Sequence, residues 1–258
     1  MDNCRRMLIC TDNFDNMMTG IYEAWAYERD GYEIEILTGE NQMYSLFCEC
    51  CQIETDSDKA DKVVRTIRRK LGTEIFQYVY RAAMHADSKR TEVIFRFLKK
   101  GFAMGRSVAE DFSDPWVLRL LELSRKVWNE AQKYKGVLRF QEIYLESGEQ
   151  MLLSCIEPKS NVLTLLAEHF ADRLPIENWL IWDKARHSLA VHPRGCEWFL
   201  REGLEQQEEQ AFLAEEEDAY SKLWNIFCQT IGIENRYNPK CQDTMLPKWY
   251  RRHMTEFQ

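Results

Sequence analysis

The sequence lacks the long apolar runs that membrane and secreted proteins carry. No stretch approaches the roughly 18 consecutive apolar residues of a membrane-spanning helix, and the opening residues 1–6 do not resemble a signal peptide. Proline and glycine are also scarce, at 6 and 11 of 258 residues, and no linker rich in Pro, Gly or Ser divides the chain. We therefore expect a cytoplasmic protein without membrane contact, folded as a single domain over residues 1–258. An acidic connector at 204–218 is the only candidate hinge.

Signatures of several common enzyme classes are absent too. The sequence has no Gly-x-Gly-x-x-Gly, no phosphate-binding loop, no Gly-x-Ser-x-Gly and no His-x-Glu followed by Pro-Cys-x-x-Cys. These absences argue against dinucleotide-binding proteins, common nucleotide hydrolases, serine hydrolases and zinc deaminases. No cofactor is identified from the sequence, and whether the protein is an enzyme stays open.

The cysteines do not follow a disulfide framework or a typical metal site. There are 9, an odd number, whereas secreted frameworks pair their cysteines evenly. Cys48, Cys50 and Cys51 form a Cys-x-Cys-Cys cluster, but the second pair that a zinc site normally uses is missing. We expect reduced thiols that pack among apolar neighbours, and no bound metal.

The sequence does contain enough apolar surface for a large core. Hydrophobic residues make up 45% of the chain and include 8 Trp and 13 Phe, which argues against disorder. The formal net charge is -8, so any contact with a polyanion has to come from local basic patches.

The spacing of the apolar residues predicts an α+β fold. Strand-like runs at 7–10 and 33–37 flank a helical pattern over 14–27, which makes an N-terminal strand-helix-strand. A central helical segment, antiparallel hairpins, and an aromatic C-terminal helix with a basic tail follow. The central helices are predicted at 56–71, 74–86, 91–102 and 116–134, and the hairpins at 137–145 with 151–156 and at 179–183 with 188–192.

Two segments are strongly basic. Segment 59–70 holds six Lys or Arg against one acid, a pattern that is usually a solvated helix face, with phosphate contact as the alternative. The tail 236–253 holds five against one, interleaved with aromatic rings. Cations contact phosphates and rings stack on unpaired bases, so the tail is typical of a nucleic-acid surface. Alternatively it docks on its own domain or pairs with the acidic run 205–218. The candidate nucleic-acid-binding residues are Arg139, Arg173, Arg236, Asn238, Lys248, Trp249, Tyr250 and Arg251.

A second candidate site lies where a predicted strand ends, before the helix that contains His169. Glu157 follows that strand, while His169 and Arg173 stand four residues apart on one helical face. Glu157 and His169 could therefore serve as catalytic acid and base. The plainer interpretation is that His169 is a core residue and that Arg139 and Glu157 form a structural ion pair.

Several runs, in order, resemble one bacterial family. They are Val127–Phe140 (VWNEAQKYKGVLRF), Ile156-Glu-Pro158, His169–Arg173 (HFADR), Trp179–Asp183 (WLIWD), and Leu223-Trp224 through Arg236-Tyr-Asn-Pro239 to Leu246-Pro-Lys-Trp-Tyr250. The family is one of unknown function that is assigned to DNA metabolism. Its members are linked with a radical-SAM protein of DNA modification or repair, and some are fused to a uracil-DNA-glycosylase-like domain. The family commonly has a His where this chain has Gln132.

The resemblance implies a role in DNA metabolism without supplying an established active site. The leading hypothesis is an accessory protein that binds DNA, single-stranded DNA in particular, and acts with a radical-SAM partner. One alternative is an enzyme that modifies a nucleic acid or nucleotide through Glu157 and His169. Another is a protein-interaction adaptor that does not bind DNA.

Overall fold

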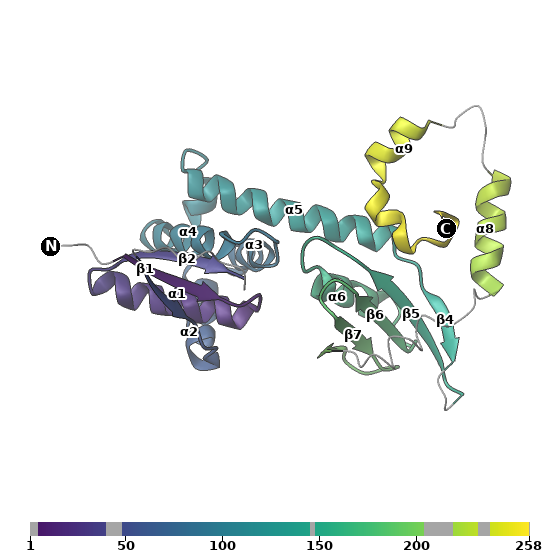
Figure 1. The fold of residues 1–258 in the computed structure, drawn as a ribbon, viewed down its shortest axis with the longest axis horizontal. Helices are drawn as coiled ribbons and strands as arrows, with labels where there is room; N and C mark the ends of the chain where they lie inside the picture. Colours follow the sequence, from purple (N-terminus) through teal and green to yellow (C-terminus); the bar gives the residue numbers. More distant parts are fainter. Residues whose placement is uncertain (1–4, 40–47, 145–147, 204–218, 232–237, 258) are drawn as a thin grey trace. The chain divides into compact units, whose positions relative to one another are not determined.

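The computed structural model describes residues 5–39, 48–144, 148–203, 219–231 and 238–257 (Figure 1). These residues form a mixed α+β protein with one three-stranded and one five-stranded sheet, which confirms the predicted fold class. The contacts divide the chain into two compact units, unit 1 (Met1–Asn129) and unit 2 (Glu130–Gln258). That the two units fold together as a single domain stays a prediction, which an unfolding experiment can test.

Unit 1 is built on a parallel sheet with the strand order β2-β1-β3. The strands are β1 (Arg5–Cys10), β2 (Glu33–Thr38) and β3 (Glu49–Gln52), and α1 (Phe14–Arg29) joins the first two. Asn13 starts α1, because its side chain accepts the backbone N–H groups of Asp15 and Asn16 at 2.9 and 3.2 Å. The strand-helix-strand is confirmed, whereas β3 was not predicted, because a four-residue strand with two cysteines has no clear period.

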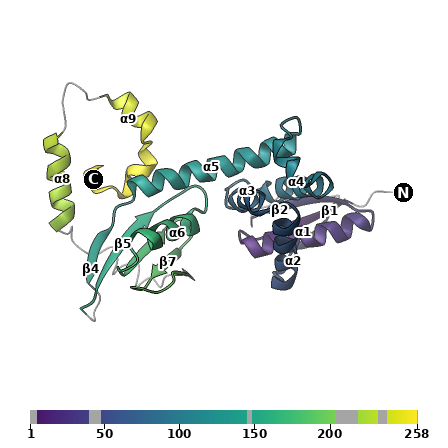
Figure 2. The same cartoon turned by 180° about the vertical axis from the view of Figure 1, so that it is seen from behind.

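Helices cover both faces of this sheet, with α1 and α4 on opposite sides (Figures 1 and 2). The helical segment consists of α2 (Ser57–Lys70), α3 (Thr73–Ala83), α4 (Arg90–Met104), the 3-10 helix η1 (Gly105–Glu110) and α5 (Pro115–Val137). Gly72 joins α2 to α3 with φ 94°, a backbone conformation that favours glycine. The last of these helices was predicted to end at Tyr134, whereas α5 continues for three more residues to Val137.

Unit 2 is built on a mixed sheet with the order β4-β5-β6-β7-β8. Its strands are β4 (Gln141–Tyr144), β5 (Gln150–Ile156), β6 (Trp179–Asp183), β7 (Ser188–His192) and β8 (Phe199–Glu202). Both predicted hairpins are confirmed, since β4 pairs antiparallel with β5 and β6 antiparallel with β7. Strands β5 and β6 run parallel, joined through α6 (Leu163–Arg173). A crossover helix between neighbouring parallel strands brings their carboxyl ends to one edge of the sheet.

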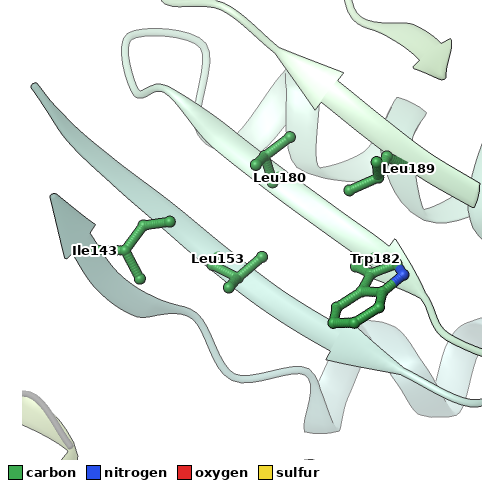
Figure 3. Packing of buried hydrophobic residues seen from close by; sticks show 5 residues of the cluster. All are labelled: Ile143, Leu153, Leu180, Trp182 and Leu189. Carbon is green, nitrogen blue, oxygen red and sulfur yellow. The ribbon is translucent and has the colours of Figure 1, made fainter. Parts of the chain in front are cut away.

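One face of the unit 2 sheet carries a tight aliphatic and aromatic cluster (Figure 3). Leu153 of β5 is paired in register with Leu180 of β6, and Trp182 with Leu189 of β7. Side chains two residues apart on a strand share a face, so these positions and Ile143 point the same way. The cluster fixes the register of four neighbouring strands, and therefore also fixes where β5 and β6 end.

The C-terminal elements begin with the predicted aromatic helix, α8 (Ala219–Ile231), followed by α9 (Pro239–Met245) and the 3-10 helices η3 (Lys248–His253) and η4 (Thr255–Phe257). Tyr250 of η3 is buried against Tyr134 of α5, with ring centroids 4.9 Å apart. The described part of the basic tail thus docks on its own unit, which is one of the interpretations that the sequence left open. The acidic run 204–218 lies outside the described residues.

Candidate functional site

Polar side chains gather where the parallel strands β5 and β6 end. Glu157 follows β5 directly, and Asp183 is the last residue of β6. The backbone N–H of Lys184 donates to the carbonyl of Ile156 at 3.0 Å, so the two strand ends are held side by side. In sheets with parallel strands, the carboxyl edge is where ligands most often bind.

The loop after Glu157 is held from α5. The buried carboxylate of Glu130 accepts the backbone N–H of Lys159 at 2.8 Å and that of Ser160 at 3.0 Å. Two charge-assisted hydrogen bonds from a rigid helix keep this loop in one conformation. Lys159 itself is exposed, so its side chain points to solvent from an ordered backbone.

Arg186 holds the same loop from the other side. Its guanidinium donates to the carbonyl oxygens of Pro158 and Lys159 at 3.1 and 2.6 Å, and to the Asp183 carboxylate at 3.0 Å. Asp183 is fully buried, and this burial raises its pKa even though Arg186 lies beside it. Asp183 and Arg186 therefore act as a structural pair that shapes the loop.

The C-terminal helix η3 reaches back to Glu157. Arg252 donates to one carboxylate oxygen of Glu157 at 2.6 Å, and Nε2 of His253 lies 2.9 Å from the other. Burial would raise the pKa of Glu157, but the hydrogen bonds from Arg252 and His253 outweigh it and hold the pKa below its ordinary value. The pKa of His253 is lowered, chiefly by burial, although Glu157 opposes the shift.

Two tyrosines, Tyr134 and Tyr250, meet edge to face beneath this region. Burial raises the pKa of Tyr134 well above its ordinary range and that of Tyr250 to about 12. Tyr134 Oη is buried, has no hydrogen-bond partner among the residues that the structure describes, and lines a cavity of about 10 Å³ together with Cys155 and His253. Such a cavity has room for one water molecule, which would satisfy the hydroxyl.

Cations and one ring remain at the surface. Lys159 Nζ lies 4.1 Å from the ring centroid of Trp249, and Lys133 Nζ lies 5.4 Å from that of Tyr250. Trp249 is 37% exposed, Lys248 is exposed, and Arg252 keeps 61% of its side chain in solvent. The surface therefore presents four cations and a partly open indole, while its carboxylates are engaged in hydrogen bonds.

Some predicted nucleic-acid contacts hold the C-terminal segment together. Arg139 donates to Glu256 at 2.7 Å, so the expected ion pair with Glu157 is wrong: Glu157 instead bonds to Arg252 and His253 of η3. Arg251 donates to the carbonyl of Leu246 and to Asp243, at 2.9 and 2.8 Å.

The remaining predicted residues divide into three groups. Asn238 caps α9 by accepting the backbone N–H of Cys241 at 3.1 Å, and Tyr250 is too buried to stack on a base. Lys248 and Trp249 reach the surface. Arg236 lies outside the described residues.

His169 and Arg173 lie on α6. Burial lowers the pKa of His169, and the nearby charges of Lys135 and Arg173 lower it further. No hydrogen bond joins His169 to Glu157 in the described part of the chain. The structure pairs Glu157 with His253 instead, a contact across 96 residues that spacing within one helix could not indicate.

The sequence analysis did not assign functions to Lys159, Lys184, Arg252 or His253. A weak signal was available for the first two, because each lies within three residues of a predicted strand end. Residues after parallel strands are good site candidates, but the sequence predicted only hairpins here. Without the parallel pairing of β5 and β6, nothing indicated that these residues meet.

A search of the described ranges finds no group of three His, Cys, Asp or Glu side chains that could hold a metal ion. Cys50 and Cys51 lie on β3, and the Cys50 thiol is directed at the carbonyl of Cys48 at 3.8 Å. Among the helices that the structure describes, none has both the length and the apolar character to cross a membrane.

A family model for a domain of unknown function, DUF4130, matches residues 88–256, from the start of α4 to the end of the chain's C-terminal helices. The chain belongs to this family. Among solved structures, one similar chain is a Methanococcus jannaschii protein described as a family II inorganic pyrophosphatase. The alignment covers 80% of this chain and 96% of that one, at 7% sequence identity and a TM-score of 0.21, values too low to support any inference. No curated protein matches the chain significantly.

Proposed function

We propose that this protein binds nucleic acid as an accessory protein of DNA metabolism and works beside a radical-SAM protein that performs the chemistry. The proposal draws on the family resemblance of the sequence and on the surface at the carboxyl edge of the unit 2 sheet. The observation that carries it is the group of exposed cations around the partly open ring of Trp249. Cations neutralise phosphates, and an indole stacks on an unpaired base.

The ordered backbone beneath this surface also supports the proposal that the surface binds a ligand. Glu130 and Arg186 hold the backbone of the loop that carries Lys159, and the buried Tyr250 anchors its neighbour Trp249. A rigid frame lowers the entropy lost when a ligand immobilises its contacts. The stacking ring favours single strands, because bases in a duplex are covered by their neighbours.

Binding of labelled single-stranded and duplex DNA across a salt series tests the proposal. Lys159→Glu with Lys248→Glu should weaken single-strand binding, with the salt slope falling by about 0.7 for each lost phosphate contact. Trp249→Ala should cost about 1–3 kcal/mol of single-strand affinity. Unchanged binding in the folded double variant would remove this surface from the proposal.

Arg194→Glu is the matched control. Arg194 is exposed and follows β7, which runs antiparallel to β6, so it lies at the opposite edge of the sheet. The same reversal of charge there should leave binding unchanged. If the wild-type chain binds no DNA even at low salt, the adaptor hypothesis leads, and the cations of η3 serve the fold or face a protein.

A second candidate function is catalysis on a nucleotide or a base. The hydrogen bond between Glu157 and His253 favours it, because a carboxylate that orients an imidazole is a common acid-base arrangement. His253→Ala should then abolish turnover while substrate affinity is kept. His169→Ala distinguishes the two histidines, since loss of turnover there would return the role to His169.

The partnership with a radical-SAM protein is tested separately. The full chain should capture the purified radical-SAM protein at micromolar concentration, with or without DNA. No complex under either condition would leave a DNA-binding protein that acts alone.

A further inference from the structure

About half of the basic side chains that the structure describes in unit 1 pair with carboxylates. Arg6 bonds to Glu49 at 2.6 Å, and Lys100 bonds to both Asp111 and Asp114, at 2.5 and 2.7 Å. Further pairs of this kind hold Arg90, Arg96, Lys99 and Arg119. The basic residues of this unit that have no such partner are candidates for contact with an anion where several of them lie together.

Several such residues lie at the end of α2. Arg65, Arg68, Arg69 and Lys70 have no carboxylate partner in the part of the chain that the structure describes. Arg65 donates instead to a carbonyl of its own helix, and Arg68 and Lys70 lie over the rings of phenylalanines at 4.2 and 5.3 Å. Four cations without counter-charges within six residues make a locally positive surface that attracts an anion.

A cavity of about 670 Å³ opens beside this surface. Arg68 lines it from α2, and Arg106 lines it from η1. A Cβ placed on Gly72 would lie 3.5 Å from Arg106 Nε, so the Arg106 guanidinium packs against the turn that follows α2. Two guanidiniums that have no carboxylate partner among the described residues thus line one cavity, whose size is that of a small-molecule site.

The walls of the cavity supply rings and apolar surface. Phe112 is 63% exposed, an unusual position for a large apolar ring, and Tyr78 lies on the α3 side. Glu74 and Glu110 also line the cavity. Glu74 is engaged, because it accepts the Tyr78 hydroxyl at 2.9 Å, a bond that raises the pKa of Tyr78.

We propose that this cavity binds a phosphate group of a nucleic-acid strand. Arg68 and Arg106 contact the phosphate, and the ring of Phe112 stacks on an adjacent base. Arg65, Arg69 and Lys70 at the end of α2 contact further phosphates of the same strand. Guanidiniums bind phosphates through paired hydrogen bonds, and exposed rings stack on bases. The cations at the end of α2 that lie outside the cavity favour a strand as the ligand. A free nucleotide in the cavity would not contact them, whereas the phosphates of a strand would.

Binding of a labelled single-stranded oligonucleotide to the full chain tests this site. Arg68→Glu with Arg106→Glu should weaken binding at low salt by at least about tenfold and reduce the salt slope by about 0.7 for each contact. Arg106→Gln is a milder variant at an exposed position and should weaken binding less. An unchanged affinity in both variants, with unfolding curves like those of the wild type, would overturn the proposal.

Arg29→Glu provides the matched control, because the Arg29 side chain is 81% exposed at the end of α1, outside the cavity lining. It should bind like the wild type. A second arm measures AMP binding by calorimetry. If AMP binds and Arg106→Gln abolishes that binding while oligonucleotide binding is unaffected, the cavity takes a free nucleotide and the strand proposal is wrong.

The site does not depend on the surface of unit 2. Loss of binding in the unit 1 variants alone would support this site and remove the Lys159 surface from the proposed function. Loss in the Lys159→Glu, Lys248→Glu protein alone would do the reverse. Partial losses in both would support two contact surfaces for one strand or two.

Discussion

Units 1 and 2 each carry a basic stretch, and the two stretches use their charges differently. In unit 2, Arg251 and Arg252 of η3 bond to Asp243 and Glu157 of the same unit, and the ring of Tyr250 is buried. These contacts hold the C-terminal segment together and attach it to α5 and to the end of β5.

In unit 1, the cations at the end of α2 meet rings, backbone or solvent, but no carboxylate among the described residues. Both stretches are basic in the sequence, since 59–70 holds six Lys or Arg against one acid and 236–253 holds five against one. The basic character of a stretch alone therefore does not tell whether its cations are available for a ligand. Whether a cation is available depends on which carboxylates the fold places beside it.

The largest expected effect is on stability, and it tests whether the two units unfold independently of each other. Ile94→Ala in unit 1 and Leu153→Ala in unit 2 each empty a fully or almost fully buried site, so each should cost about 2–5 kcal/mol. If the chain folds as a single domain, both variants shift one urea transition, followed by fluorescence and far-UV circular dichroism. Two transitions, each moved by one variant only, would contradict the single-domain prediction.

The next largest effect on stability is expected at two buried polar side chains, one in each unit, that accept hydrogen bonds from the backbone. Glu130→Ala leaves two backbone N–H groups without an acceptor, which should cost about 1–3 kcal/mol or more. Asn16 plays a similar part in unit 1, where it accepts from Thr11 and donates to the Ile53 carbonyl, both at 2.8 Å.

Asn16→Ala should therefore cost a similar amount to Glu130→Ala in urea unfolding. Glu130→Gln keeps one carbonyl oxygen as an acceptor and should lose less than Glu130→Ala. Equal losses for the two Glu130 variants would mean that its charge, rather than its hydrogen bonds, stabilises the loop.

A smaller effect should appear in the pH dependence of unit 2. The pKa of His253 is lowered by burial, and that of Glu157 is lowered by its partners against the opposing effect of burial. Both groups then bind fewer protons in the folded state than in the unfolded state, so stability rises with pH and is lost as the pH is lowered. The His253 contribution declines as pH falls from the ordinary pKa of 6.5 through the folded value, and the Glu157 contribution declines below 4.5.

The urea midpoint measured from pH 8 to pH 3 checks these two windows. His253→Gln should flatten the upper window relative to the wild type, and Glu157→Gln the lower one. His187→Asn, at an exposed turn, is the control and should leave the profile as it is. A profile of the His253→Gln protein that overlays the wild type would contradict the expected role of this histidine.

The smallest effects compare single arginines of the two basic stretches. Arg251→Ala removes bonds to a carbonyl and a carboxylate and should cost about 1 kcal/mol. Arg69→Ala should change the free energy of unfolding by no more than about 0.5 kcal/mol, because Arg69 is exposed and has no hydrogen bond or ion pair within the described ranges. A larger cost at Arg69 than at Arg251 would reverse the comparison between the stretches.

Local patterns predicted most of the elements. The hydrophobic period over 14–27 and the turn residues between 145 and 151 are properties of a few neighbouring residues, so the first helix and the first hairpin could be found without a structure. The short strands β3 and β8 were missed, because four residues do not establish a period.

The candidate site was predicted less well than the fold. Glu157 was singled out correctly as the residue at a strand end, but its predicted partners were His169 and Arg139. The partners that the structure provides, Arg252 and His253, lie almost a hundred residues further along the chain. Such a contact depends on where the C-terminal segment returns, which no local spacing encodes.

By itself, the sequence determined the class of fold, the helices and hairpins, and the two places where positive charge is concentrated. These depend on periodicity and composition, which act over a few residues. Only the tertiary structure decided that β5 and β6 are parallel neighbours, that Tyr250 is buried beside an open Trp249, and that the cations of α2 lack carboxylate partners among the described residues. The physical reason is that burial and ion pairing depend on contacts between side chains far apart in the sequence. The packing of the whole chain determines which of these contacts form.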